Sequence, residues 1–212
     1  LIAYSSTNKV YGDLEHLNYE ELEKRYEIKG LSSGIDEKMP LDFSTPYGCS
    51  KGAADQYVRD WARVFGLKTV VFRHSSIFGG RQFSSFDQGW IGWFCQKAIE
   101  QKKQYINNLN IESFTIAGSG KQVRDVLHSD DLVLLYWKAF LNKEKMNGQI
   151  FNIGGGIDNS LSLLELFDIL SEILNLQDLK YQRIERRKSD QDCFIANIKK
   201  ARDILNLSLI HI

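Results

Sequence analysis

The stretch TPYGCSKGAADQYVRDWARVFGLKTVVFR, residues 45–73, joins a strongly periodic helical pattern to a short, very apolar run. Its first part predicts a helix over Thr45–Phe65 that ends at Gly66. The apolar side chains at helical spacing are Ala54, Tyr57, Trp61, Val64 and Phe65. Lys68–Arg73 is β-branched and apolar, which predicts a buried strand. A helix followed at once by a buried strand is typical of α/β folds.

Predicted strands and helices also alternate before and after this stretch. Further strands are predicted at Leu1–Ser6, Ser113–Ala117, Val123–Leu127, Gln149–Ile153, Tyr181–Ile184 and Cys193–Ala196. Further helices are predicted at Tyr19–Tyr26, Trp90–Lys102, Asp130–Leu141, Ser162–Leu174 and Lys199–Leu205, the fourth opened by a capping box. Ser75–Gln88 reads as a loop. Alternating strands and helices predict an α/β fold with parallel pairing.

Composition excludes several classes of protein. The 212 residues are 43% hydrophobic and 25% charged, an ordinary globular composition. Lys plus Arg and Asp plus Glu are 27 each, so a strongly basic nucleic-acid binder is not expected. No apolar run reaches the roughly 18 residues of a membrane span. The three scattered cysteines are expected to be reduced and cytosolic rather than a disulfide framework, and no metal site is expected.

Tyr47 and Lys51 carry the chemistry that the pattern suggests. They lie four residues apart, so they share one face of the predicted helix. An ammonium group beside a phenol lowers the phenol's pKa, and a phenol so placed can act as a base near neutral pH. The isolated spacing is common and usually means a surface lysine. The segment Ser5-Ser6-Thr7 adds context because it ends a predicted strand, where open α/β sheets bind ligands.

Together these two segments resemble the extended short-chain dehydrogenase/reductase family, which includes nucleotide-sugar epimerases and dehydratases. The resemblance implies NAD as the cofactor. It also implies that Thr7 hydrogen-bonds the sugar oxygen, that Tyr47 is the acid/base, and that Lys51 lowers the tyrosine pKa and holds the nicotinamide ribose. These three residues are therefore the expected catalytic set.

Further segments resemble the family in the same order along the chain. They are Arg73-His74-Ser75-Ser76, the Gly118–His128 segment with Arg124-Asp125, Phe151–Gly155, and Arg187-Lys188-Ser189-Asp190. The cofactor site implied by the resemblance comprises Ser5, Ser6, Tyr47, Lys51, Arg73, His74 and Ser75. The implied substrate site comprises Thr7, Ser76, Gln88, Gly89, Trp90, Thr115, Ala117, Arg124, Arg187 and Asp190. In this assignment Arg124 and Arg187 clamp a diphosphate, since a guanidinium pairs bidentately with phosphate.

The resemblance also implies how the chain is organised. We expect a Rossmann-type doubly wound parallel sheet, incomplete because its N-terminal strands are absent, with a small C-terminal α/β substrate-binding lobe. Residues 1–76 would be the C-terminal half of the NAD-binding domain, with parts of 122–155 returning to it. Residues 77–212 would be mainly the nucleotide-sugar lobe.

The residues that follow Thr7 help to distinguish which activity of the family this chain is expected to have. The family's dehydratases carry Thr-Asp-Glu, whereas this chain has Thr7-Asn8-Lys9, which lacks that carboxyl pair. The Phe72–Phe94 and Asp42–Tyr57 segments resemble the CDP-paratose/CDP-tyvelose 2-epimerases. This implies an NAD-dependent cytoplasmic epimerase that inverts C2 of a CDP-dideoxyhexose, homo-oligomeric when complete. Alternatives are a 4-epimerase or decarboxylase of the same superfamily, or a non-catalytic nucleotide-sugar binding protein.

The chain differs from the family in two features: the glycine-rich cofactor motif and the residue at position 192. The family's glycine-rich NAD fingerprint is absent, and Gly154-Gly155-Gly156 comes too late to replace it. We therefore expect a piece of a longer enzyme that alone binds NAD weakly or not at all and tends to aggregate. Asp192 stands where an arginine is expected, so either that nucleotide contact is lost or Asp192 points away. The apolar tail Leu207–Ile212 suggests a second cut end.

Overall fold

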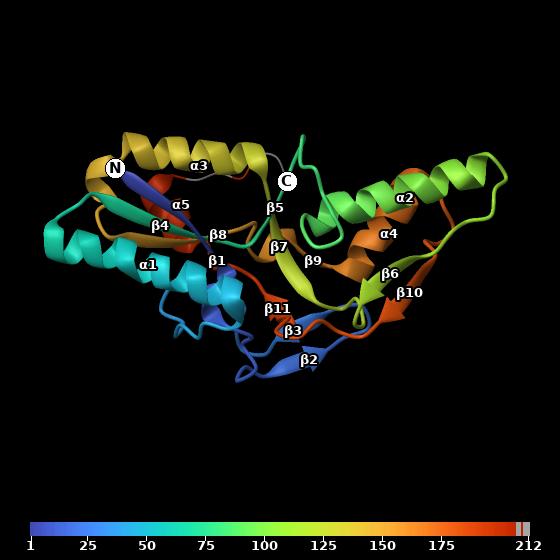
Figure 1. Cartoon of the computed structure of the whole chain (residues 1–212), viewed down its shortest axis with the longest axis horizontal. Helices are drawn as coiled ribbons and strands as arrows, with labels where there is room; N and C mark the ends of the chain where they lie inside the picture. Colours follow the sequence, from blue (N-terminus) through green and yellow to red (C-terminus); the bar gives the residue numbers. More distant parts are fainter. Residues whose placement is uncertain (207–208, 210–212) are drawn as a thin grey trace.

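The computed structural model describes residues 1–206 and residue 209, and its centre is a parallel sheet of three strands. The strands are β1 (Ile2–Thr7), β4 (Thr69–His74) and β8 (Gln149–Ile153), in the order β1-β4-β8 (Figure 1). Thr7 pairs with His74, and His74 pairs with Ile153. The three strands thus end at one edge of the sheet.

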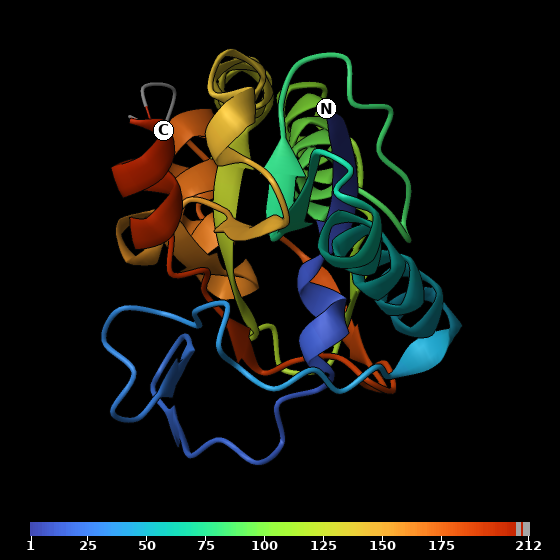
Figure 2. The same ribbon diagram turned by 90° about the vertical axis from the view of Figure 1, so that its left-hand side faces the viewer.

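Strand β4 is buried on both faces, and its side chains alternate between two helix layers. Val70 and Phe72 pack against α3 (Ser129–Leu141) and α5 (Lys199–Leu205). Thr69 and Arg73 face α1 (Thr45–Phe65) on the opposite side, where the Thr69 hydroxyl donates to the Val58 carbonyl. Figure 2 shows α1 on one side of the sheet and α3 with α5 on the other. The predicted α/β layering is therefore present.

Helix α1 begins and ends where the sequence predicts. Pro46 lies in its first turn, and Gly66 ends it in the left-handed region with φ 67°, donating to the Ala62 carbonyl. The helix approaches its neighbours closely at a glycine: a Cβ on Gly52 would lie 2.3 Å from the Phe43 ring. Any larger residue there would push α1 away from the segment that precedes it.

A second group of elements lies beside the central sheet, at the right of Figure 1. Strand β6 (Phe114–Ala117) pairs in parallel with β10 (Tyr181–Ile184), and α2 (Trp90–Ile106) packs on α4 (Leu163–Leu174). The aromatic core of this group includes Phe94, Phe114 and Phe167. The predicted capping box is present, because Ser162 and Glu165 bond each other's backbone N–H.

Strand β7 (Val123–His128) connects the two groups. It pairs in parallel with β5 (Ser76–Phe78) and β11 (Cys193–Phe194), and antiparallel with β9 (Ser160–Ser162). Three short 3-10 helices complete the described elements: η1 (Asn8–Tyr11), η2 (Lys143–Lys145) and η3 (Ile157–Asn159). Since β5 follows β4 after a single residue, the chain passes directly from the central sheet to β7.

The helix predicted over Tyr19–Tyr26 is wrong. This segment forms an antiparallel hairpin of β2 (Tyr19–Glu21) and β3 (Tyr26–Ile28). Its apolar residues follow the two-residue period of a strand and pack on Val123 and Cys193. Tertiary burial of that face therefore overrides the local helical signal.

Other boundaries differ by smaller amounts. The loop predicted over Ser75–Gln88 contains β5, α2 continues four residues beyond Lys102, and β11 is two residues long. Two residues beyond β11, Ala196 forms an isolated parallel bridge with Ile35. The tail predicted as a cut end, Leu207–Ile212, lies outside the described residues apart from Leu209.

None of the helices in the described part of the chain is both long and apolar enough to cross a membrane. Within residues 1–206 and 209, no three His, Cys, Asp or Glu side chains come together as a metal site. Cys49, Cys95 and Cys193 are all free thiols.

A buried ion pair fastens α1 to the central sheet. The Arg73 guanidinium on β4 donates two hydrogen bonds, of 2.8 and 2.9 Å, to the Asp55 carboxylate on α1. Both side chains are 1% exposed or less. The Ser6 hydroxyl on β1 donates to Asp55 at 2.8 Å, and Arg73 donates to the Tyr11 hydroxyl at 3.0 Å. Asp55 thus links α1 to both β1 and β4.

Removing one partner of this pair should cost much more than removing both. Asp55→Ala leaves a buried, uncompensated guanidinium, so we expect it to lower the free energy of unfolding by about 3–5 kcal/mol. The double variant Asp55→Leu/Arg73→Met should be less destabilised than Asp55→Ala. Asp60→Ala, which breaks the exposed Asp60–Arg63 pair, is the control and should cost less than about 1 kcal/mol.

Urea denaturation followed by circular dichroism measures all three values. A loss for Asp55→Ala no larger than that for Asp60→Ala would contradict a structural role for the buried pair.

Candidate active site

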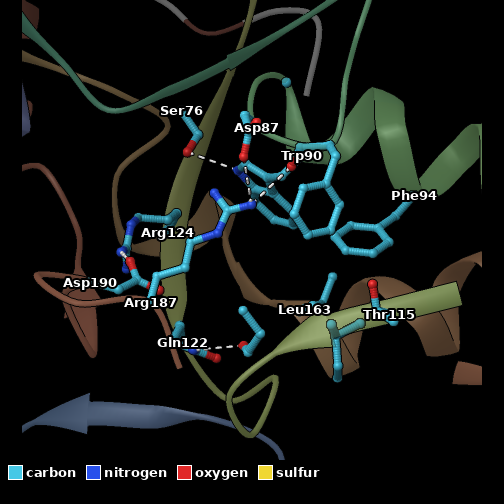
Figure 3. Close-up of a pocket in the computed structure, with 14 residues that line it drawn as sticks. Ser76, Asp87, Trp90, Phe94, Thr115, Gln122, Arg124, Leu163, Arg187 and Asp190 are labelled. Carbon is cyan, nitrogen blue, oxygen red and sulfur yellow. Dashed lines mark hydrogen bonds and ion pairs between the residues drawn. The ribbon is translucent and has the colours of Figure 1, made fainter. Parts of the chain in front are cut away.

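A pocket of about 250 Å³ opens between the two groups of elements (Figure 3). Its walls come from β5, the loop before α2, the start of α2, β6, β7, α4 and the segment after β10. The lining residues are Ser76, Phe86, Asp87, Gly89, Trp90, Phe94, Thr115, Ile116, Ala117, Gln122, Arg124, Leu163, Arg187 and Asp190. Segments more than a hundred residues apart in the sequence therefore form one pocket.

The pocket contains every predicted substrate residue except Thr7 and Gln88. Six of its lining residues were not predicted as site residues: Phe86, Asp87, Phe94, Ile116, Gln122 and Leu163. Phe94 belongs both to the aromatic core and to the pocket wall. Its place one helical turn after Trp90 is the signal that could have found it. Asp87 has no such signal, because only the folded loop brings it to the pocket.

Two arginines lie on the wall of the pocket, and each bonds a carboxylate. Arg124 donates to Asp190 at 2.7 Å, and Arg187 donates to Asp87 at 3.2 Å. Arg187 also lies 4.9 Å from the centre of the Phe86 ring. Figure 3 shows the two guanidinium groups on the same side of the pocket. Paired guanidinium groups in a concave site are suited to a diphosphate, which would replace Asp87 as the partner of Arg187.

The remaining wall is a mostly apolar slot. Trp90 donates from Nε1 to the Ser76 hydroxyl at 3.1 Å, which fixes the indole at the pocket mouth. Phe94 and Leu163 face β6, where Thr115 and Ala117 are partly exposed. An apolar slot with polar groups at its rim fits a flat heterocycle such as a nucleobase.

Tyr47 and Lys51 lie in the first two turns of α1. Tyr47 is 52% exposed, and the Lys51 ammonium donates to the Ser5 carbonyl at 2.8 Å. Asp55 follows Lys51 by four residues, so the buried ion pair lies on the same helix face as Tyr47 and Lys51. The fold thereby holds the Tyr-x-x-x-Lys pair against the carboxyl end of β1.

Thr7 and Gln88 lie outside the pocket wall. Thr7 is 6% exposed and caps η1, where its oxygen accepts a hydrogen bond from the Lys9 N–H at 3.3 Å. Gln88 is exposed and closes a tight turn with Ser85.

The other predicted cofactor residues line the carboxyl ends of β1 and β4. The side chains of Ser6 and Arg73 are committed to Asp55, so only their backbones are available to a ligand. The Ser75 hydroxyl donates to the Asp125 carbonyl at 3.0 Å. His74 lies beside Tyr136, whose hydroxyl is 3.1 Å from its Nε2.

His74 is a buried neutral side chain with one unused polar atom. Burial, with a smaller contribution from the Lys51 charge, lowers the pKa of His74 to about 4. Among the described residues its Nδ1 has no hydrogen-bond partner. An orphaned polar atom close to Lys51 and Ser5 suits the carboxamide and ribose of a nicotinamide. The nicotinamide half of NAD therefore fits the residues present.

The glycine turn 154–156 does not offer a phosphate cradle. A Cβ on Gly154 would lie 1.9 Å from an Asp125 carboxylate oxygen, and one on Gly155 would lie 2.1 Å from the Val126 carbonyl. Asp125 accepts a hydrogen bond from the Gly156 N–H at 3.0 Å, and burial raises its pKa to about 6. This turn thus packs β8 against β7.

Asp192 stands where an arginine was expected, and its negative charge has a partner close by in the sequence. Arg186 pairs with it at 2.7 Å. The carboxylate is therefore compensated, and it does not line the pocket formed by Trp90 and Arg124.

Comparison with known proteins gives consistent matches. A family model described as the NAD dependent epimerase/dehydratase family matches residues 2–154. The CDP-paratose 2-epimerase of Salmonella typhi is 57% identical over 207 residues, which cover 98% of this chain and 60% of that protein. The putative UDP-glucose 4-epimerase of Methanocaldococcus jannaschii is 30% identical over 184 residues, covering 78% and 55%.

Among solved structures, the UDP-glucose 4-epimerase of Thermotoga maritima with UDP-glucose matches with a TM-score of 0.74 and 26% identity. The match covers 98% of this chain and 57% of that one. The chain thus spans less than two thirds of the relatives it matches. These matches confirm the predicted family resemblance and the predicted Rossmann-type fold class.

His74 should make the folded state sensitive to acid. Its pKa is lower in the folded state than in the unfolded state, so its stabilising contribution is complete above about pH 6.5 and is lost as the pH falls towards 4. We expect a loss on the order of 3 kcal/mol across that range. The measurement is the difference in unfolding free energy between wild type and His74→Phe as a function of pH.

His16→Phe, which replaces an exposed histidine, should keep the wild-type slope. A His74→Phe curve parallel to wild type from pH 7 to pH 4 would contradict the neutral buried state of His74.

Proposed function

We infer the function from one established point: the chain belongs to the NAD dependent epimerase/dehydratase family. We propose that it carries the acid/base residues and the nucleotide-sugar site of an epimerase. The observation that supports this most directly is the placement of Tyr47 and Lys51 against the end of β1, held there by Asp55. The pocket with its two arginines is the accompanying substrate site.

The proposed substrate is CDP-paratose, inverted at C2 to give CDP-tyvelose. The 57% identity to a CDP-paratose 2-epimerase across nearly the whole chain supports this choice. The residues after Thr7 also disfavour a dehydratase, because Asn8 is an amide and Lys9 is a cation. Burial, partly opposed by Asp190, lowers the pKa of Lys9 to about 8, so it still carries its proton in most molecules at neutral pH.

In the proposed reaction Tyr47 takes the proton of the C2 hydroxyl, and Lys51 stabilises the phenolate that does so. Lys51 and the backbone around His74 would hold the nicotinamide half of NAD, which would supply the hydride acceptor and donor for C2. Thr7 hydrogen-bonds a sugar oxygen. The keto sugar turns over while its nucleotide stays bound, and Tyr47 then gives the proton back to the keto oxygen. No atom is gained or lost, and inversion at C2 is the only net change.

The pocket holds the nucleotide while the sugar turns. We propose that the base lies in the apolar slot between Trp90 and β6, and that Arg124 and Arg187 bind the diphosphate. Asp190 fixes Arg124 in advance, which reduces the entropy lost on binding. In the proposed division of the chain, residues 1–76 with parts of 122–155 serve the cofactor, and residues 77–212 mainly serve the nucleotide sugar.

Replacing Tyr47 should separate catalysis from binding. Tyr47→Phe removes only the proton carrier, so we expect turnover of CDP-paratose to fall by at least about a hundredfold while the Kd for CDP stays within about threefold. Tyr57→Phe is the matched control, since it removes an exposed tyrosine hydroxyl from the same helix. Turnover is followed by NMR of the CDP-sugars with the native protein. A Tyr47→Phe variant with the turnover of Tyr57→Phe would overturn the assignment.

Replacing Arg187 should weaken nucleotide binding. Arg187→Ala removes a charge-assisted contact to the diphosphate, so we expect the Kd for CDP to rise about tenfold to a hundredfold. Arg63→Ala, which removes an exposed arginine of α1, should leave the Kd unchanged. Isothermal titration calorimetry gives both values. Equal CDP affinity in wild type and Arg187→Ala would exclude Arg187 from the phosphate site.

A further inference from the structure

A chain of side-chain hydrogen bonds runs through the interior from Thr7 to the backbone of Gly12. The Thr7 hydroxyl donates to Asn8 Oδ1 at 3.2 Å, and Asn8 Nδ2 donates to Gln191 Oε1 at 3.0 Å. Gln191 Nε2 then donates to the Gly12 carbonyl at 2.7 Å. Gln191 is fully buried, and Thr7 and Asn8 are 6% and 8% exposed. Water therefore has little access to substitute for any link.

The Gly12 end fixes the direction of these hydrogen bonds. The Gly12 carbonyl can only accept, so Gln191 must turn its NH₂ group to Gly12 and its oxygen to Asn8. Asn8 must then turn its own NH₂ group to Gln191 and its oxygen to Thr7. Only glycine fits at position 12, because a Cβ there would lie 2.4 Å from the Asp42 carbonyl and its φ is 71°.

This direction determines how Thr7 meets a ligand. Its one hydroxyl hydrogen is used by Asn8, and one of its two lone pairs accepts the Lys9 N–H at 3.3 Å. One lone pair remains. Thr7 is thus held as an acceptor for a donor group of the ligand.

The same series of hydrogen bonds connects Thr7 to residues 187–191, the segment that includes the proposed phosphate-binding Arg187. Gln191 follows Asp190, the partner of Arg124, and Arg124 donates to the Gln191 carbonyl at 2.9 Å. Lys9 donates from Nζ to the Ser189 carbonyl at 3.0 Å. Helix η1 and this segment are therefore joined at two points.

We propose that Gln191 and Asn8 are positioning residues for the epimerisation: they hold the Thr7 oxygen to accept a hydrogen bond from a hydroxyl of the bound sugar, and they set its place relative to the diphosphate. This inference rests on the proposed function. It assigns a role to two buried amides that are not among the expected site residues and do not line the pocket.

The test compares two buried glutamines in the native protein. Gln191→Met removes the link between Asn8 and Gly12 with little change in volume. Gln101→Met is the matched control, since Gln101 is 3% exposed and bonds only backbone groups of residues 112 and 180. The measurements are the melting temperature, the Kd for CDP and kcat for CDP-paratose.

Both variants should lower the melting temperature. Gln191→Met alone should lower kcat, by about tenfold to a hundredfold, with the Kd for CDP within about threefold of wild type. A kcat within about twofold of wild type would overturn the proposal. A loss of CDP affinity as large as the loss of kcat would also overturn it, because it would mean that Gln191 only shapes the phosphate segment.

Asn8→Asp gives a second test that does not depend on Gln191→Met folding. The carboxylate that this substitution introduces cannot donate to Gln191 when ionised, whereas its protonated form donates from the O–H and still accepts from Thr7. The ratio of the variant's kcat to that of wild type should therefore rise as the pH falls from 8 to 5.5. A ratio independent of pH would contradict the directed chain.

The other charges around this site are the same in both proteins, so the ratio isolates position 8. They are Lys9 and, facing it, Asp13, Arg124, Arg186 and Asp190. If the wild-type holoenzyme, with NAD bound, fails to convert CDP-paratose, the proposed function fails. If wild type converts it and the variants behave as wild type does, only this inference fails.

Discussion

The buried pair between Arg73 and Asp55 is the interaction on which the rest of the site depends. It lies between α1 and the middle strand of the sheet, and it collects Ser6 and Tyr11 into one network. A pair this deeply buried is costly to desolvate and stabilises the fold only when each polar atom has a partner. Here both Asp55 oxygens accept hydrogen bonds from Arg73. Asp55 therefore anchors α1 to both β1 and β4.

The position of α1 against the sheet also determines where the residues that precede Asp55 on the helix lie. Tyr47, Lys51 and Asp55 follow each other at four-residue intervals, so anchoring Asp55 also places the helix positions that carry Tyr47 and Lys51. Lys51 is fastened again by the Ser5 carbonyl. The substrate side is held by a different kind of contact, in which Arg124 and Arg187 are oriented by carboxylates of nearby loops. The hydrogen bonds from Thr7 through Asn8 to Gln191 join the end of β1 to the segment that carries Asp190, the partner of Arg124.

Much of this arrangement is readable from local sequence, and the remainder depends on long-range packing. The bounds of α1 and the capping box at Ser162 are encoded within a few residues, so they could be predicted. The hairpin at residues 19–28 could not, because its short strands are stabilised by Val123 and Cys193, far away in the chain. Arg124 and Arg187 were found through motifs, but Asp87 and Phe86 come to the pocket only through the folded loop. The roles of Asn8 and Gln191 were missed for the same reason, since 183 positions separate the two amides.

We propose that the enzyme inverts a sugar carbon by removing and returning the same hydrogen, with Tyr47 carrying only the hydroxyl proton. The most direct test is to incubate the native protein with CDP-paratose in deuterated water and to examine C2 by NMR. The account predicts CDP-tyvelose whose C2 hydrogen is still protium, because the hydride never exchanges with solvent. Deuterium at C2, or inversion at another carbon, would contradict it.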